Sequence, residues 1–225
     1  VKKAHGDIIT FIDVDDLWLK EKLSKQIKYF RDNKSIDFVY SNLFKIKKYL
    51  IFNLKKKIFK YELPSGFICD KILYQYSVGW PTVAIKKKIL KSKKPFNEKL
   101  DMLSDYDFVI KYSMRKKIGA LQEPLAIYRE HSNQLSRKNF FIQAKQYTIW
   151  FNKIKNSKNI KLYKNFNKLK EKYELLNVIL KINLEAKFYK KIKYVKKLKN
   201  QKNKIKIFLF FILNKLYINY LLSTT

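Results

Sequence analysis

The feature that most constrains this chain is an apolar segment that runs directly into a cluster of carboxylates. Residues 7–12 read DIITFI, and Asp13, Val14, Asp15 and Asp16 follow at once. A short apolar run of this kind is typical of a strand buried on both faces in a mainly parallel sheet. Three carboxylates so close together repel one another unless a cation lies between them. The segment therefore predicts an α/β fold with a cation beside one strand end.

The spacing of the carboxylates indicates which cation. Asp13 and Asp15 are two residues apart, so on an extended chain their side chains point the same way, toward the sheet edge where α/β proteins bind ligands. Oxygen ligands suit Mn²⁺ or Mg²⁺, which keep open positions for substrate phosphates. An EF-hand loop is excluded because its sixth position would be Trp18 and its twelfth Ser24. The alternative is that Asp15 or Asp16 caps the next helix and the other carboxylates are solvated.

Strands and helices alternate over the first 135 residues. The helical spacing of Leu19, Leu23, Ile27 and Phe30 predicts a helix over residues 17–31, and Glu21 is placed to pair with Lys25. The other predicted elements are strands at 37–41, 82–86 and 120–128, a hairpin within 43–62, and helices at 67–76 and 105–116. This alternation predicts an α/β sandwich.

The composition changes at about Ser136, where Gly and Pro disappear. Apolar residues at three-or-four spacing, among them Leu169, Leu176 and Leu184, predict a lysine-rich helical tail over residues 136–225, separate from a domain at 1–135. The tail ends in an apolar run at 207–222, which Lys215 and two asparagines interrupt, so that it is too short to span a bilayer. The run predicts an interfacial membrane helix, and the alternative is a helix packed on the protein's own surface.

The charge of the chain favours polyanionic partners. Lys and Arg number 51 against 18 Asp and Glu, giving a net charge of +33. Anionic lipid headgroups and nucleic acid both attract such a chain, although codon bias in an AT-rich genome would also enrich lysine. The single cysteine, Cys69, excludes an intrachain disulfide or a cysteine metal site and suits a reducing, cytoplasmic setting.

Several segments in order resemble one enzyme family. HGDIITFIDVDDLWLKEKLSKQI at 5–27 is similar to the Asp-x-Asp segment of inverting family 2 glycosyltransferases, which have the GT-A fold. DFVYSN at 37–42, WPTVAIKKKIL at 80–90, FNEKLDMLSDYDFVIKYS at 96–113 and PLAIYREHSNQLS at 124–136 resemble later segments of that family. The resemblance covers residues 4–136. It implies a truncated GT-A-like mixed sheet flanked by helices, followed by the helical tail.

The resemblance also implies the roles of individual residues. Asp13 and Asp15 would hold the Mn²⁺ or Mg²⁺ that bridges the diphosphate of a nucleotide-sugar donor. Asp105 falls where the family places its general base, with Ser104 in place of the usual Glu. Asp107 is the nearest rival for the base, and its place in the first turn of a helix suits a carboxylate stabilised by the helix dipole.

Four further residues are expected near the substrates. Arg129 and His131 would lie near the diphosphate or the metal, and Asp16 beside them. For His131 a purely structural role is the alternative. Trp80 would stack on an acceptor sugar, the alternative being packing within a turn.

The implied reaction is transfer of a sugar to a hydroxyl of a glycan or lipid-linked acceptor, with inversion at the anomeric carbon. The family resemblance and the basic tail together suggest synthesis of cell-surface polysaccharide by a cytoplasmic protein held on the inner face of the membrane. In the family a nucleotide-binding half precedes the metal motif, whereas here only Val1 to His5 precede it. We therefore expect these 225 residues alone to be almost inactive.

Two other functions remain open from the sequence. A phosphatase of the haloacid dehalogenase type also carries Asp-x-Asp after an apolar strand, with Asp13 as nucleophile and Asp15 as acid/base. Leu17 stands where that family prefers Thr or Val, and no convincing later Lys or Asp-Asp motif follows. The other alternative is a non-catalytic basic remnant that binds membranes or nucleic acid, although nucleic acid is not the expected partner.

Overall fold

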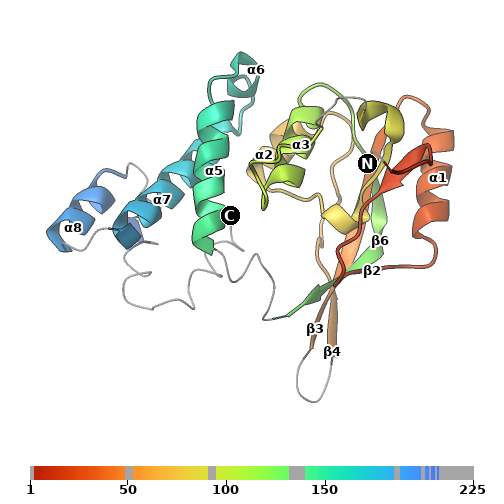
Figure 1. Cartoon of the computed structure of the whole chain (residues 1–225), viewed down its shortest axis with the longest axis horizontal. Coiled ribbons are helices and arrows are strands. Elements are labelled where there is room, and N and C mark those ends of the chain that lie inside the picture. The colour runs from red at the N-terminus through yellow and green to blue at the C-terminus, as the bar shows by residue number, and fades with distance from the viewer. Residues whose placement is uncertain are drawn as a thin grey trace. The chain divides into compact units, whose positions relative to one another are not determined.

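The computed structural model describes residues 3–48, 53–90, 95–131, 140–184, 188–198, 201–202, 204–205 and 207. The chain divides into two compact units. Unit 1 comprises Val1–Ile72 and Tyr76–Gln134, and unit 2 comprises Leu73–Gln75 and Leu135–Thr225. Unit 1 contains the sheet, and the helices α5 to α8 belong to unit 2 (Figure 1).

Unit 1 is built on a six-stranded mixed sheet. Its strands are β1 (Ile8–Thr10), β2 (Leu17–Trp18), β3 (Phe38–Lys48), β4 (Asn53–Lys57), β5 (Ala84–Lys86) and β6 (Gly119–Glu130). The order is β1-β5-β3-β6-β2, and β4 forms a hairpin with β3. Among the described strands, β3 and β6 form the one parallel pair and every other pair is antiparallel. The predicted mixed sheet is confirmed.

The first strand differs from its prediction. β1 has three residues and pairs antiparallel with β5, so it does not belong to a mainly parallel sheet. Ile9 is buried, whereas Ile8 and Thr10 on its other face are half-buried. A short apolar run has the same composition in either strand direction, and only pairing across the sheet fixes the direction.

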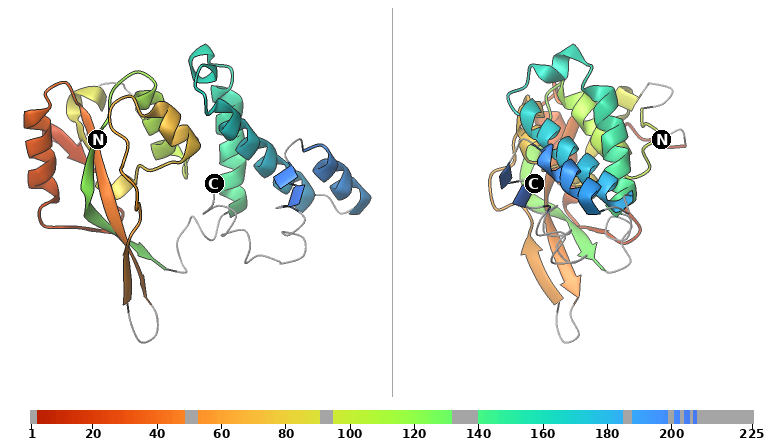
Figure 2. Two further views of the ribbon diagram at one scale, coloured as in Figure 1. Left: turned by 180° about the vertical axis from the view of Figure 1, so that it is seen from behind. Right: turned by 90° about the vertical axis from the view of Figure 1, so that its left-hand side faces the viewer.

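Helices cover both faces of the sheet (Figures 1 and 2). They are α1 (Lys22–Asp32), α2 (Cys69–Tyr74) and α3 (Ser104–Ser113), together with the 3-10 turns η1 (Trp80–Thr82) and η2 (Lys87–Leu90). Val39 on β3 packs in a cluster with Phe30 of α1, while the neighbouring Phe38 contacts Phe108 of α3 at 6.2 Å between ring centroids. Because successive strand residues point to opposite faces, α1 and α3 lie on opposite sides of the sheet.

The buried face of α1 contains Phe30 from the apolar series of the sequence but not Leu23 or Ile27. Leu23 and Ile27 are exposed, at 44% and 38%, whereas Lys22 and Gln26 are buried. Lys22 Nζ donates to Gln26 Oε1 at 2.9 Å and lies 4.3 Å from the centre of the Trp18 ring, and burial lowers its pKa to about 8. Two hydrogen-bonded polar side chains, Lys22 and Gln26, therefore take part in the buried face of the helix, where apolar side chains are usual.

Gln26 and Trp18 connect this region to η1. Gln26 Nε2 donates to the carbonyl of Thr82 at 2.7 Å, and Trp18 Nε1 donates to the carbonyl of Pro81 at 2.9 Å. The segment after the carboxylate cluster therefore holds the turn that carries Trp80. The predicted caps of α1, Asp15 and Asp16, are wrong, because the residue at the N-cap is Glu21.

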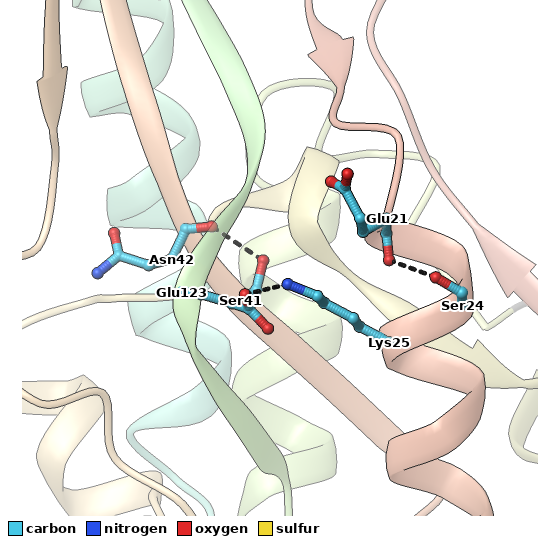
Figure 3. A network of polar contacts seen from close by, with 6 residues as sticks. All are labelled: Glu21, Ser24, Lys25, Ser41, Asn42 and Glu123. Atoms are coloured by element: carbon cyan, nitrogen blue, oxygen red, sulfur yellow. Dashed lines mark hydrogen bonds and ion pairs between the residues drawn. The ribbon is translucent and has the colours of Figure 1, made fainter.

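The outer side of α1 is joined to β6 by an ion pair (Figure 3). Lys25 Nζ pairs with Glu123 Oε2, so the predicted pairing of Lys25 with the Glu21 carboxylate is wrong. Glu21 instead acts through its backbone, whose carbonyl accepts a hydrogen bond from Ser24 Oγ at 2.9 Å. Behind the ion pair, Ser41 Oγ donates to the carbonyl of Asn42 at 2.9 Å, where the register between β3 and β6 shifts.

Unit 2 contains α5 (Phe140–Ile154), α6 (Lys158–Lys161), α7 (Phe166–Leu184) and α8 (Phe188–Lys196). Phe151 of α5 stacks on Tyr173 of α7 at 4.5 Å between ring centroids, and Leu169, Leu176 and Ile179 are buried. Leu184, expected on the buried face, is 85% exposed. The predicted interfacial helix at 207–222 lies outside the described residues apart from Ile207. Within the described part of the chain, no helix is both long and apolar enough to cross a membrane.

The burial of Lys22 and Gln26 on α1 leads to a first prediction. Gln26→Ala removes the hydrogen bond to Thr82 and leaves the buried Lys22 ammonium without its acceptor, so we expect a loss of about 2 kcal/mol in the free energy of unfolding. Ile27→Ala, one residue away and exposed, should cost less than about 0.5 kcal/mol. Urea unfolding of both variants measures the difference, and equal losses would contradict the assignment of the buried face.

Candidate active site

The carboxylate cluster lies in a turn between β1 and β2. The backbone N–H of Asp16 donates to the carbonyl of Asp13 at 3.0 Å, and the chain then enters β2. β2 pairs antiparallel with β6, with Leu17 opposite Ile127. This register places the turn beside the carboxyl end of β6, which contains Arg129 and is followed by His131.

Asp16 is the buried member of the cluster, at 4% exposure. Its Oδ1 accepts a hydrogen bond from the backbone N–H of Arg129 at 3.2 Å, and its Oδ2 is buried with no hydrogen-bond partner among the described residues. Burial, together with the charges of Asp15 and Asp13, raises the pKa of Asp16 to about 6. Asp16 therefore joins the turn to β6, a structural role that its sequence position did not reveal.

Asp15 makes the second connection to β6. Its Oδ2 lies 2.8 Å from Nε2 of His131, and the Nε–H of Arg129 donates to its backbone carbonyl. The hydrogen bond to His131 is the largest cause of a lowered pKa at Asp15. The structure thus brings Arg129 and His131 to the metal motif, as contacts of Asp15. We call Asp15, Asp16, Arg129 and His131 the clasp.

Asp13 and Asp105 approach each other from distant parts of the chain. Asp13 is exposed, and partial burial of its carboxyl together with the charge of Asp15 raises its pKa. Asp105 lies in the first turn of α3, where its Oδ1 accepts the backbone N–H of Tyr106 at 2.7 Å. Burial raises the pKa of Asp105, and the charge of Asp13 adds to this effect. The charge of Asp13 therefore reaches Asp105 electrostatically.

Asp107 is a less suitable base than Asp105. It is 3% exposed, and its Oδ2 accepts a hydrogen bond from Lys111 Nζ at 2.5 Å, one helical turn along α3. A buried carboxylate paired with an ammonium group is shielded from a substrate. Its surroundings are those of a structural ion pair.

Trp80 belongs to an aromatic cluster beside the motif. The half-buried Trp80 ring stacks on Phe11 at 4.3 Å between centroids and meets Phe96 and Phe108 edge-on at 5.8 and 6.4 Å. Phe11 lies two residues before Asp13. Packing accounts for one side of the indole, and stacking of an acceptor sugar on Trp80 stays a prediction.

The donor atoms present fit a divalent cation. Asp13 and Asp15 supply carboxylate oxygens, and the repulsion that raises the pKa of Asp13 and Asp16 is of the kind that a cation relieves. No cluster of three or more His, Cys, Asp or Glu side chains suited to a metal is found in the described residues. A cation held by two carboxylates keeps positions for phosphate oxygens, which is the usual arrangement for Mg²⁺.

Comparison with known proteins identifies the first part of the chain. Residues 1–92 match the model of the family described as Glycosyl transferase family 2. This segment is a glycosyl transferase family 2 domain. It contains Asp13, Asp15, Asp16 and Trp80, whereas Asp105 and the β6 residues of the clasp follow the matched range.

Relatives match over most of the chain. An uncharacterized glycosyltransferase of Methanocaldococcus jannaschii is 32% identical over 74% of this chain and 58% of its own length. The UDP-Glc:alpha-D-GlcNAc-diphosphoundecaprenol beta-1,3-glucosyltransferase WfgD of Escherichia coli is 26% identical over 66% of this chain and 56% of its own. An uncharacterized glycosyltransferase of Haemophilus influenzae is 25% identical over 60% of this chain and 46% of its own length. The chain thus spans about half the length of these curated relatives. The expected loss of a nucleotide-binding half gains no support here and stays a prediction.

The clasp predicts how substitutions at Asp16 behave. Asp16→Asn keeps an oxygen for the Arg129 N–H and removes a charge repelled by Asp13 and Asp15, so the free energy of unfolding should be unchanged or higher at pH 7. Asp16→Ala leaves the Arg129 N–H without its acceptor and should cost about 1–2 kcal/mol. Urea unfolding separates the two variants. If Asp16→Asn lowered the free energy of unfolding as much as Asp16→Ala does, the charge of Asp16, and not its hydrogen bond, would stabilise the turn.

Proposed function

We propose that this protein transfers a sugar from a nucleotide-diphosphate sugar to a hydroxyl of a glycan or lipid-linked acceptor, in one inverting displacement. The family 2 domain at residues 1–92 and the name of the Escherichia coli relative, which describes a glucosyltransferase acting on a diphosphoundecaprenol acceptor, support this function. Synthesis of cell-surface polysaccharide is the corresponding process. The match also favours this function over the phosphatase alternative.

The observation that carries the proposal is the electrostatic effect of Asp13 on Asp105. The exposed Asp13 belongs to the proposed metal motif, and Asp105 is a half-buried residue whose carboxyl pKa is raised by burial. A general base works best when its pKa approaches the working pH. Two carboxylates in different environments can therefore take different roles at one site: Asp13 binds the cation and Asp105 accepts the proton of the acceptor hydroxyl.

The remaining residues assist the departure of the diphosphate. Asp13 and Asp15 would hold Mn²⁺ or Mg²⁺, which when bound neutralises charge on the leaving group. The clasp keeps Asp15 in place, and the guanidinium of Arg129 at the carbonyl of Asp15 adds a positive charge beside the motif. Asp105 then receives the proton from the attacking oxygen on the opposite side of the anomeric carbon.

The proposal is tested by carboxamide variants of the full native protein. Asp105→Asn cannot accept a proton, so kcat for sugar transfer should fall about 10²–10⁴-fold, with Mn²⁺-dependent binding of the donor retained. Asp13→Asn should weaken Mn²⁺ binding, measured by electron paramagnetic resonance with a nucleoside diphosphate present.

Asp101→Asn is the matched control, since Asp101 is exposed four residues before Asp105 and should leave kcat unchanged. Full activity of Asp105→Asn would refute the assignment of the base. Hydrolysis of a generic phosphate ester that is lost in Asp13→Asn would instead support the phosphatase alternative.

We also propose that unit 2 binds anionic membrane surfaces. Residues 135–225 hold 23 Lys and Arg against three Glu, which gives a net charge of +20 over 91 residues. Ile142 and Ile149, seven residues apart on α5, are 51% and 52% exposed, and the exposed Lys145 lies between them. Exposed apolar side chains among lysines suit the interface of an anionic bilayer, where a lipid-linked acceptor would be found.

Sedimentation with lipid vesicles tests this partner. The protein should bind vesicles containing phosphatidylglycerol, and raising NaCl from 0.1 to about 0.5 M should release most of it, because salt screens surface charge. Ile142→Ser with Ile149→Ser should weaken binding, while the matched Leu23→Ser on α1 of unit 1 should not. Equal binding to uncharged phosphatidylcholine vesicles would contradict the electrostatic part of the proposal.

A further inference from the structure

A buried hydroxyl beside the proposed base lacks a partner. Tyr76 lies in the segment that follows α2, and its phenol oxygen is buried with no hydrogen-bond partner among the described residues. Buried polar atoms are almost always hydrogen-bonded, and an exception calls for a physical explanation. A phenylalanine would fill the same space without an unsatisfied oxygen.

The surroundings of Tyr76 point to Asp105. Its ring packs against Tyr106 at 4.8 Å between centroids, and Tyr106 directly follows Asp105 and donates its backbone N–H to that carboxylate. After burial, the charge of Asp105 is the largest influence that raises the pKa of Tyr76. Figures 1 and 2 show α2 and α3 side by side, and the ring contact places Tyr76, two residues after α2, next to Tyr106 in the first turn of α3.

The other groups near Tyr76 are less suitable partners. Tyr106 and Tyr40 also act on it, but both are phenols. The hydroxyl of Tyr40 already donates to the carbonyl of Pro64 at 2.8 Å and lies 3.4 Å from Ser77 Oγ. Asp105 is the one carboxylate among the groups that act on Tyr76, and an ionised carboxylate accepts hydrogen bonds at both oxygens.

We infer that Tyr76 is a positioning residue whose O–H donates a hydrogen bond to the Asp105 carboxylate and orients it toward the acceptor hydroxyl. This inference rests on the proposed function. Oδ1 of Asp105 accepts the backbone N–H of Tyr106, and Tyr76 would hold the carboxylate from a second direction. A remaining lone pair of the carboxylate can then face the attacking oxygen of the acceptor. The phenol keeps its proton throughout, because its own pKa lies well above the usual value.

Tyr76→Phe in the full native protein tests the inference. Stability to urea should fall slightly, because the substitution removes the proposed hydrogen bond to Asp105. We expect kcat to fall about tenfold, the equivalent of one lost hydrogen bond, with KM for the donor unchanged. The other groups that act on Asp105 are the backbone N–H of Tyr106, its own backbone N–H and the charge of Asp13. Loss of a hydrogen bond to the charged form should therefore move the acidic limb of the pH profile of kcat/KM to higher pH.

Two tyrosine variants serve as controls. Tyr40→Phe removes a hydroxyl that already has hydrogen-bond partners. The stability of this variant to urea should fall, and the acidic limb of its kcat/KM pH profile should stay in place. Tyr74→Phe changes a residue that is 57% exposed and should alter neither quantity. If Tyr76→Phe keeps the native kcat and pH profile while Asp105→Asn is inactive, the role of Tyr76 is refuted and the proposed function stands. Full activity of Asp105→Asn would refute both.

Discussion

The geometry of the site depends on the clasp between the Asp13–Asp16 turn and the end of β6. Asp16 accepts the N–H of Arg129, and Asp15 is held by the His131 ring and the Arg129 guanidinium. These contacts oppose the mutual repulsion of the three carboxylates, which by itself would drive the turn apart. Because β6 also forms the parallel pair with β3, the turn is fixed to the centre of the sheet.

The carboxylates of the site differ in environment and therefore in chemistry. The pKa of Asp15 is lowered by its partner His131, that of Asp16 is raised by burial, and that of Asp13 is raised in part by repulsion. Asp105 reaches the same region from α3, with a covered carboxyl. The proposed site would thus combine ionised oxygens for a cation with a carboxylate of raised pKa for a proton, a separation that acid–base chemistry near neutral pH requires.

Sequence patterns predicted the type and position of most helices and strands. They did not predict which face of a helix is buried or which elements pair with each other. The strand at 37–41, the helix at 105–116 and the strand at 120–128 correspond to β3, α3 and β6. The buried face of α1 was not predicted, because Lys22 and Gln26 satisfy each other and the carbonyl of Thr82, which lies 56 residues from Gln26. Periodicity counts apolar residues and cannot anticipate a buried polar pair whose acceptor comes from elsewhere in the chain.

The sequence by itself determined the carboxylate cluster, the mixed α/β class and the concentration of positive charge after residue 135, because these follow from local composition and spacing. Only the tertiary structure decided which carboxylate is buried, which one pairs with His131, and that Tyr76 lies against the Asp105 region. Burial and hydrogen bonding depend on residues that the fold brings together from separate parts of the chain, 113 positions apart for Asp16 and Arg129 and 116 for Asp15 and His131. No local pattern in the chain carries that information.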